Sequence, residues 1–209
     1  MSHDHAHEHH DELSNSSGWK RVLWIALILN AGMLLVEVVG GVTAGSSALL
    51  ADALDFFGDA SNYAISLAVA GMPILIRNRA AYVKGITVGV FGFFVLGNTV
   101  WHLINGTVPE AAVMGVIGAM ALVTNVFVAV LLYRFRGGDA NMRSVWICSR
   151  NDAVGNFAVL LAALGVFGTG TGYPDFLVAG IMVTLALSAA WQVVRAAHKE
   201  RQEEKAHHS

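Results

Sequence analysis

Long apolar stretches alternate with short polar breaks along almost the whole chain. A helix needs roughly 20 apolar residues to cross the hydrocarbon core of a bilayer, and each stretch reaches about that length. The pattern therefore predicts an all-α integral membrane protein, a bundle of six transmembrane helices. We place the six stretches at residues 22–42, 47–71, 82–104, 111–133, 144–168 and 174–196.

The composition supports a membrane protein and leaves little chain for a separate soluble domain. Of 209 residues, 55% are hydrophobic and 13% are charged, whereas soluble domains carry about 25% charged residues. Cys148 is the only cysteine, so the chain has no intrachain disulfide. We expect a His- and acid-rich disordered cytoplasmic tail over residues 1–19, a six-helix transmembrane domain over 20–197 and a short cytoplasmic tail over 198–209.

Basic residues fall on alternate breaks between the apolar stretches. The other set of breaks contains no Lys or Arg at all. Cytoplasmic loops of membrane proteins carry the excess of Lys and Arg, so we expect both termini to lie in the cytoplasm. We expect a multi-pass protein of the plasma or inner membrane. We expect no nucleic-acid partner. The basic set comprises Lys20, Arg21, Arg77, Arg79, Lys84, Arg134, Arg136, Arg143, Arg195, Lys199, Arg201 and Lys205.

Three aspartates interrupt the second apolar stretch. Asp52, Asp55 and Asp59, together with Asn62, fall within one sector of a helix at about 100° per residue. Carboxylates on one sector repel each other, and charges at bilayer depth are costly unless they are neutralised. Either a cation or protons can neutralise this row, which is a physical basis for metal/proton exchange.

The fifth apolar stretch carries a second pair of ligand-type side chains. Cys148 and Asp152 have the same four-residue spacing as Asp55 and Asp59, and this spacing stacks side chains on one helix face. The two pairs together supply four ligands, the number that a tetrahedral divalent cation needs. Carboxylates with one thiolate suit Zn²⁺ or Cd²⁺ better than Mg²⁺ or Ca²⁺, which prefer oxygen alone.

Each of these residues also has a structural interpretation. A buried Asp52 caps or bonds a neighbouring helix as readily as it assists a metal, and a lone buried Cys148 usually packs as a small hydrophobe. Arg150 projects away from Cys148, and either pairs with Glu37 on the first span or extends to the cytoplasmic interface. We regard five residues as accessory candidates: Asp52, Asn151, Asn156, Glu37 and Arg150.

The N-terminal tail alternates histidines with carboxylates. Such a composition forms a flexible, weak collector of Zn²⁺, Ni²⁺ or Co²⁺, and the alternative is a solvated disordered tail without that role. The histidines concerned are His3, His5, His7, His9 and His10.

Two intramembrane motifs resemble the cation diffusion facilitator family. Gly45-Ser-Ser-Ala-Leu-Leu-Ala-Asp52-Ala-x-Asp55-x-x-x-Asp59 is similar to that family's second helix, and Cys148-Ser-Arg-Asn-Asp152-Ala-Val-Gly155-Asn156 to its fifth. Cys148 stands where the family has His or Asp. Further positions also resemble the family: Asn30, Glu37 and Gly41 its first helix, Asn125 its fourth, and Pro174-Asp175 the start of its sixth.

The resemblance implies a homodimeric transporter rather than an enzyme. Such a transporter exports Zn²⁺, with Cd²⁺ or Co²⁺ as other possible substrates, from the cytoplasm by proton antiport. The resemblance also implies a site of Asp55, Asp59, Cys148 and Asp152, with the divalent cation as substrate and no permanent cofactor. The chain ends shortly after the last span, where members of the family usually continue into a cytoplasmic metal-binding domain. A non-transporting membrane metal sensor or assembly partner therefore remains the alternative.

Overall fold

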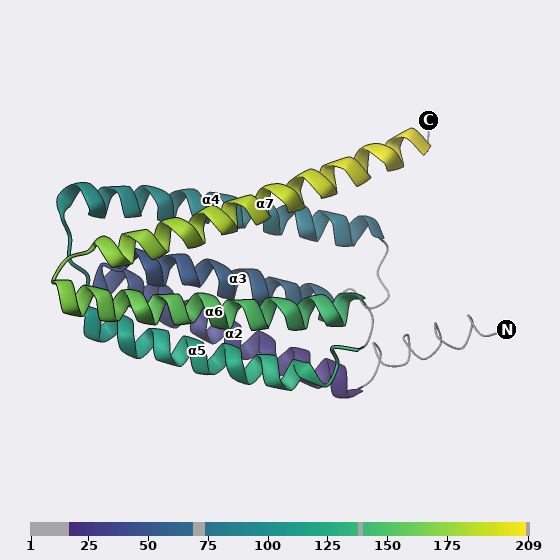
Figure 1. Ribbon diagram of the computed structural model, residues 1–209. Coiled ribbons are helices and arrows are strands. Elements are labelled where there is room, and N and C mark those ends of the chain that lie inside the picture. The colour runs from purple at the N-terminus through teal and green to yellow at the C-terminus, as the bar shows by residue number, and fades with distance from the viewer. Residues whose placement is uncertain (1–16, 69–73, 138–139, 208–209) are drawn as a thin grey trace.

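The computed structural model describes residues 17–68, 74–137 and 140–207. These residues form a bundle of long helices that lie side by side, with α3 in its interior (Figure 1). The helices are α2 (Ser17–Ala44), α3 (Ser47–Ala68), α4 (Ile74–Asn105), α5 (Ala111–Tyr133), α6 (Ala140–Thr169) and α7 (Tyr173–His207). No strand occurs in the described ranges.

The six predicted stretches correspond one to one to these helices. Residues 69–71, the predicted end of the second stretch, lie outside the described residues, as do residues 1–16 with the N-terminal histidines. Several helices run past the apolar stretch that predicts them: α4 begins at Ile74 rather than 82, and α7 continues through His207 rather than 196.

Within the described residues, five helices are long and apolar enough to cross a membrane. The remaining one, α3, has 22 residues but carries Asp52, Asp55 and Asp59. It packs against α2, α4, α6 and α7, and most of its first half is buried. The other helices therefore separate its carboxyl groups from the surroundings of the bundle.

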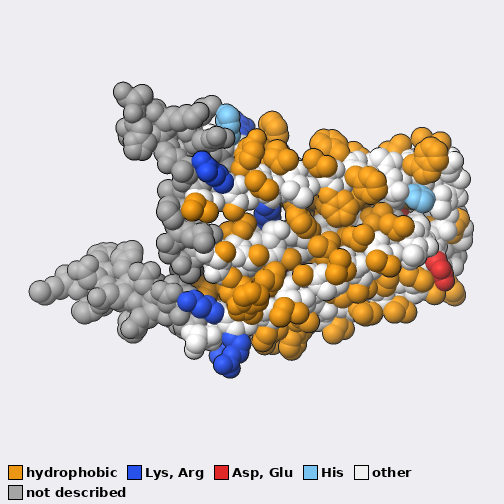
Figure 2. All heavy atoms as spheres, turned by 180° about the vertical axis from the view of Figure 1, so that it is seen from behind, with side chains coloured by type: hydrophobic (Ala, Val, Ile, Leu, Met, Phe, Trp, Pro, Cys, Tyr) orange, Lys and Arg blue, Asp and Glu red, His pale blue; other side chains and the backbone are white. Residues whose placement is uncertain are grey.

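The outer surface of the bundle is apolar. Large hydrophobic side chains such as Phe167 (82% exposed) and Ile104 (78% exposed) point outward. Figure 2 shows a continuous band of hydrophobic side chains, with Lys and Arg concentrated at the end where α2 begins and α7 finishes. An apolar exterior around buried polar groups is the arrangement that a lipid environment selects, and the chain is an integral multi-pass membrane protein.

The turn between α2 and α3 is short and closely bonded. Gly45 has φ +66°, a left-handed conformation that glycine adopts without strain. The next residue, Ser46, accepts a hydrogen bond through its Oγ from the backbone N–H of Leu49 at 3.1 Å. Ser46 thus caps the first turn of α3, as serine does at many helix starts.

A carboxylate from α7 completes this cap. Asp175 is fully buried and accepts three hydrogen bonds, from Ser46 Oγ at 2.7 Å, from the N–H of Ser47 at 2.9 Å and from the N–H of Ala48 at 3.1 Å. Backbone N–H groups in the first turn of a helix have no partner within the helix. Asp175 therefore fixes the start of α3 against the start of α7.

We expect Asp175→Ala to destabilise the protein by about 2 kcal/mol or more, because two buried N–H groups and one hydroxyl lose their acceptor. Asp175→Asn keeps one acceptor oxygen and should lose less. The measurement is the melting temperature in detergent. The control is Glu110→Ala, since the Glu110 side chain is exposed and makes no cap hydrogen bond to α5. Equal melting temperatures for wild type and Asp175→Ala would contradict the cap.

Close packing of α2 on α3 gives a second prediction. A Cβ at Gly41 would lie 2.8 Å from Leu50 Cγ and 3.1 Å from Leu50 N, whereas a Cβ at Gly32 on the same helix would meet nothing within 4 Å. We expect Gly41→Ala to cost about 1–3 kcal/mol by forcing the helices apart, and Gly32→Ala to be neutral. Thermal unfolding in detergent compares the two, and equal effects would show that the helices are not in close contact.

Candidate metal centre

The aspartates of α3 differ in their exposure and in their neighbours. Asp52 is 1% exposed and Asp59 is 5% exposed, while Asp55 is partly buried. The helix that carries them is rich in Ala and Leu around Asp52 and Asp55, and both residue types favour helix. The three carboxyl groups therefore have fixed positions along the interior of the bundle.

Tyr63 joins the acidic row of α3 to α6. Its hydroxyl donates a hydrogen bond to Asp59 Oδ2 at 2.9 Å and shares a second with Ser149 Oγ, also at 2.9 Å. Tyr63 is 1% exposed, and Ser149 is fully buried next to Cys148. These bonds bring Asp59 to the part of α6 that carries the predicted thiol ligand.

One to two turns further along α6, glycine allows Asp55 to approach. A Cβ built at Gly155 would lie 3.9 Å from Asp55 Oδ2 and 3.5 Å from Met182 Cε. Asp152 lies between Ser149 and Gly155 on α6, and its electrostatic neighbours are Asp59, Asp55 and Cys148. The structure thus brings together the four predicted ligands, Asp55 and Asp59 from α3 with Cys148 and Asp152 from α6.

The four side chains face each other without forming one coordination sphere. In the part of the chain that is described, no three His, Cys, Asp or Glu side chains are close enough together to hold a metal ion. Asp59 and Asp152 nevertheless share a side-chain hydrogen bond, which a proton between the two carboxyl groups makes possible. Asp152 Oδ2 is buried and has no hydrogen-bond partner among the described residues, so this oxygen is a free acceptor.

Two of the accessory candidates lie together. Glu37 of α2 and Asp52 are both fully buried and are direct electrostatic neighbours. Their side chains are hydrogen-bonded to each other, and no other described residue supplies a hydrogen-bond donor to either carboxyl group. They lie beside Asp55, so they extend the acidic row toward α2.

The remaining accessory candidates do not share one environment. Asn156 is fully buried, and neither its amide nitrogen nor its amide oxygen has a partner in the described residues. Asn151 is exposed and accepts a hydrogen bond from Arg150 at 3.3 Å. Arg150 is also exposed and lies over the Trp146 ring, 5.3 Å from its centroid. The predicted alternative of an Arg150–Glu37 pair is wrong for the described structure, because Arg150 is on the outer face of α6.

Sequence reasoning missed two polar residues of this region. Tyr63 follows Asp59 by four residues, so the spacing that identifies the ligand pairs also places Tyr63 on their face. The charge pattern assigns Lys84 to a cytoplasmic break, whereas the structure places it within α4, where its ammonium donates to Asn62 Oδ1 of α3. No simple sequence signal separates Lys84 from the other basic residues near helix ends.

Comparison with known proteins identifies a family. The chain matches the family described as the cation efflux transmembrane domain over residues 23–200. It is 27% identical over 208 residues to the zinc transporter ZitB of Escherichia coli, covering 93% of this chain and 66% of ZitB.

Two further relatives have similar identity and coverage. The chain is 26% identical over 203 residues to a cadmium, cobalt and zinc/H(+)-K(+) antiporter of Bacillus subtilis, covering 87% of this chain and 63% of the antiporter. It is also 26% identical over 212 residues to the metal cation efflux system protein CzcD of Cupriavidus metallidurans, covering 93% of this chain and 64% of CzcD.

The chain thus spans just under two thirds of the length of the relatives that it matches. The family match, over residues 23–200, includes residues of all six helices. The matched range includes both predicted ligand pairs on α3 and α6. The chain therefore belongs to the cation efflux, or cation diffusion facilitator, family.

Proposed function

We propose that the chain exports divalent transition-metal cations from the cytoplasm, with Zn²⁺ as the principal substrate and Cd²⁺ or Co²⁺ as further ones. The observation that supports this most strongly is the apposition of the two ligand pairs across the α3–α6 interface, held by the Tyr63 hydrogen bonds to Asp59 and Ser149. The names of the relatives refer to zinc, cadmium and cobalt.

The substrate binds to Asp55, Asp59, Cys148 and Asp152. Three carboxylates and one thiolate carry four negative charges, so a divalent cation neutralises two of them and lowers the repulsion among the carboxylates. Drawing the four side chains into a tetrahedral sphere needs α3 and α6 to approach further. The absence of a side chain at Gly155, opposite Asp55, leaves space for that approach.

Protons return the empty site to its starting state. An unoccupied cluster of carboxylates in a bundle interior is stable only when protons or another cation neutralise it. Metal binding displaces those protons, and their return after metal release completes one exchange cycle. Transport of this kind is antiport, with the basic end of the bundle on the cytoplasmic side and a homodimer as the assembled state.

Removal of a ligand should abolish transport without unfolding the protein. We expect Asp59→Ala and Asp152→Ala each to lower metal flux by more than about tenfold, a typical loss when a metal site is perturbed. The measurement is uptake of Zn²⁺, Cd²⁺, Co²⁺, Mn²⁺ and Fe²⁺ into proteoliposomes under a pH gradient. Glu110→Ala, with an exposed side chain outside the predicted ligand set, is the matched control.

Two outcomes of this experiment would change the proposal. Undiminished flux in both variants would exclude the proposed ligands. Tight binding of metal by the wild-type protein with no flux for any ion would instead support the non-transporting sensor or assembly partner.

The thiol should set the preference among metals. A thiolate favours soft Cd²⁺ over Zn²⁺ relative to oxygen ligands, so Cys148→Ser should weaken Cd²⁺ binding more than Zn²⁺ binding, by about tenfold. Titration of both metals into purified protein measures the ratio of the two affinities. Since Cys148 is the only cysteine, the thiolate-to-metal ultraviolet absorption band also reports on it alone. An unchanged ratio and an unchanged band in Cys148→Ser would remove Cys148 from the site.

A further inference from the structure

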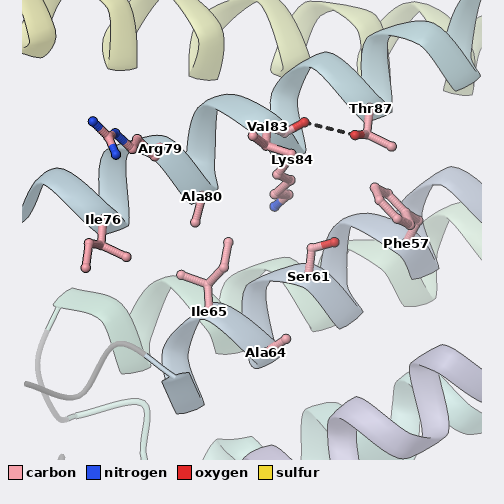
Figure 3. Close-up of a pocket in the computed structure, with 10 residues that line it drawn as sticks. All are labelled: Phe57, Ser61, Ala64, Ile65, Ile76, Arg79, Ala80, Val83, Lys84 and Thr87. Carbon is pink, nitrogen blue, oxygen red and sulfur yellow. Dashed lines mark hydrogen bonds between the residues drawn. The ribbon is translucent and has the colours of Figure 1, made fainter. Parts of the chain in front are cut away.

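Lys84 is a basic residue that the proposed metal site does not use. It lies in the wall of a cavity of about 520 Å³ between α3 and α4, whose lining is mostly apolar. Figure 3 shows its side chain extending from α4 toward α3, whereas the guanidinium of Arg79 on the same cavity turns away from α3. Lys84 is partly buried and Arg79 is exposed.

The lysine ammonium has a defined acceptor on α3. Lys84 Nζ donates a hydrogen bond to Oδ1 of Asn62, a neutral amide, rather than to a carboxylate. Asn62 follows Asp59 by three residues, close to one turn of helix, so the two side chains lie on neighbouring positions of α3. Asp59 and Cys148 are the charged or ionisable groups that interact electrostatically with the ammonium.

A lysine whose ammonium lies inside the bundle affects a nearby cation site, whereas a lysine at the lipid interface does not. A long basic side chain in a membrane helix usually extends to the nearest headgroups. Lys84 instead extends inward, and a fixed positive charge near a cation site repels the incoming cation with an energy that grows as the local dielectric falls. The same charge stabilises the carboxylates when the cation has left.

We propose that Lys84 is a tethered counter-cation of the α3–α6 ligand cluster, held beside it by Asn62. It weakens metal binding, neutralises part of the empty cluster and thereby speeds release. This role rests on the proposed function and makes Lys84 a residue that sets affinity and turnover, outside the ligand set itself.

The test is the transport kinetics of Lys84→Met compared with Lys84→Arg. Loss of the positive charge should lower KM by about tenfold, because the metal is no longer repelled, and should lower kcat as well, because release is slower. Lys84→Arg keeps the charge and should restore both constants toward wild-type values. A purely structural lysine would lower kcat or the amount of folded protein without lowering KM.

Arg79→Met is the matched control, since Arg79 lines the same cavity but turns away from α3. It should leave KM and kcat unchanged. Unchanged KM in Lys84→Met, or an equal fall of KM in Arg79→Met, would overturn the proposal.

A second variant covers the case in which Lys84→Met does not fold. Asn62→Leu keeps the ammonium but removes its acceptor, so the charge is free to move away from the cluster and KM should fall in the same direction. Zinc binding to the purified protein, measured in detergent, should tighten in parallel. Unchanged KM and zinc affinity in Asn62→Leu would contradict the tether.

The same experiments separate this role from the proposed function. If wild-type protein neither binds nor transports any of the metals, the proposed function fails. If wild-type protein transports zinc and the lysine variants behave as wild type, only the role of Lys84 fails.

Discussion

The fold depends on enclosing one acidic helix. Transfer of charged carboxyl groups into hydrocarbon is costly, so a helix with three aspartates crosses a bilayer only when other helices surround it. In this protein α3 is that helix, and α2, α4, α6 and α7 pack around it. Large apolar side chains of the bundle point outward, while Glu37, Ser149 and Asp175 of these neighbours meet polar groups of α3. The bundle therefore has its polar groups in the interior and an apolar outer surface.

Enclosure fixes the register between α3 and its neighbours at several levels. Asp175 and Ser46 hold the first turn of α3, Tyr63 holds its second half to Ser149, and Lys84 approaches it from α4 through Asn62. Each contact uses a polar group that would be unsatisfied in lipid. The polar contacts of the interior thus align the helices while also leaving Asp152 with a free carboxyl oxygen.

Much of the fold is accessible from sequence, because hydropathy in a membrane protein reports directly on which segments span. The pattern predicts all six helices, and the four-residue spacing identifies which positions of α3 and α6 face each other. The central place of α3 emerges only from the structure, although the lower apolar content of this helix is a signal for it. Propensity and hydropathy treat each segment separately, and they do not say which helix the others surround.

The errors have similar physical origins. The apolar stretch that predicts α4 begins at 82, but the helix begins at Ile74, so Lys84 lies about three turns inside it rather than at its edge. The pairing of Arg150 with Glu37 rests on charge alone, whereas the position of Arg150 on α6 directs it outward to Trp146. Opposite charge alone predicts Glu37 as the partner of Arg150, which is wrong because it ignores the direction in which Arg150 projects from its helix.

Asp175 has a consequence for motion. By bonding Ser46, Ser47 and Ala48 it fastens the first turn of α7 to the first turn of α3, and the short turn at Gly45 fastens α2 there as well. At this end of the bundle the three helices are therefore tied to one another. The turn at Gly170 joins α6 to α7 at this end as well, so any movement that parts α3 from α6 pivots about this end of the bundle.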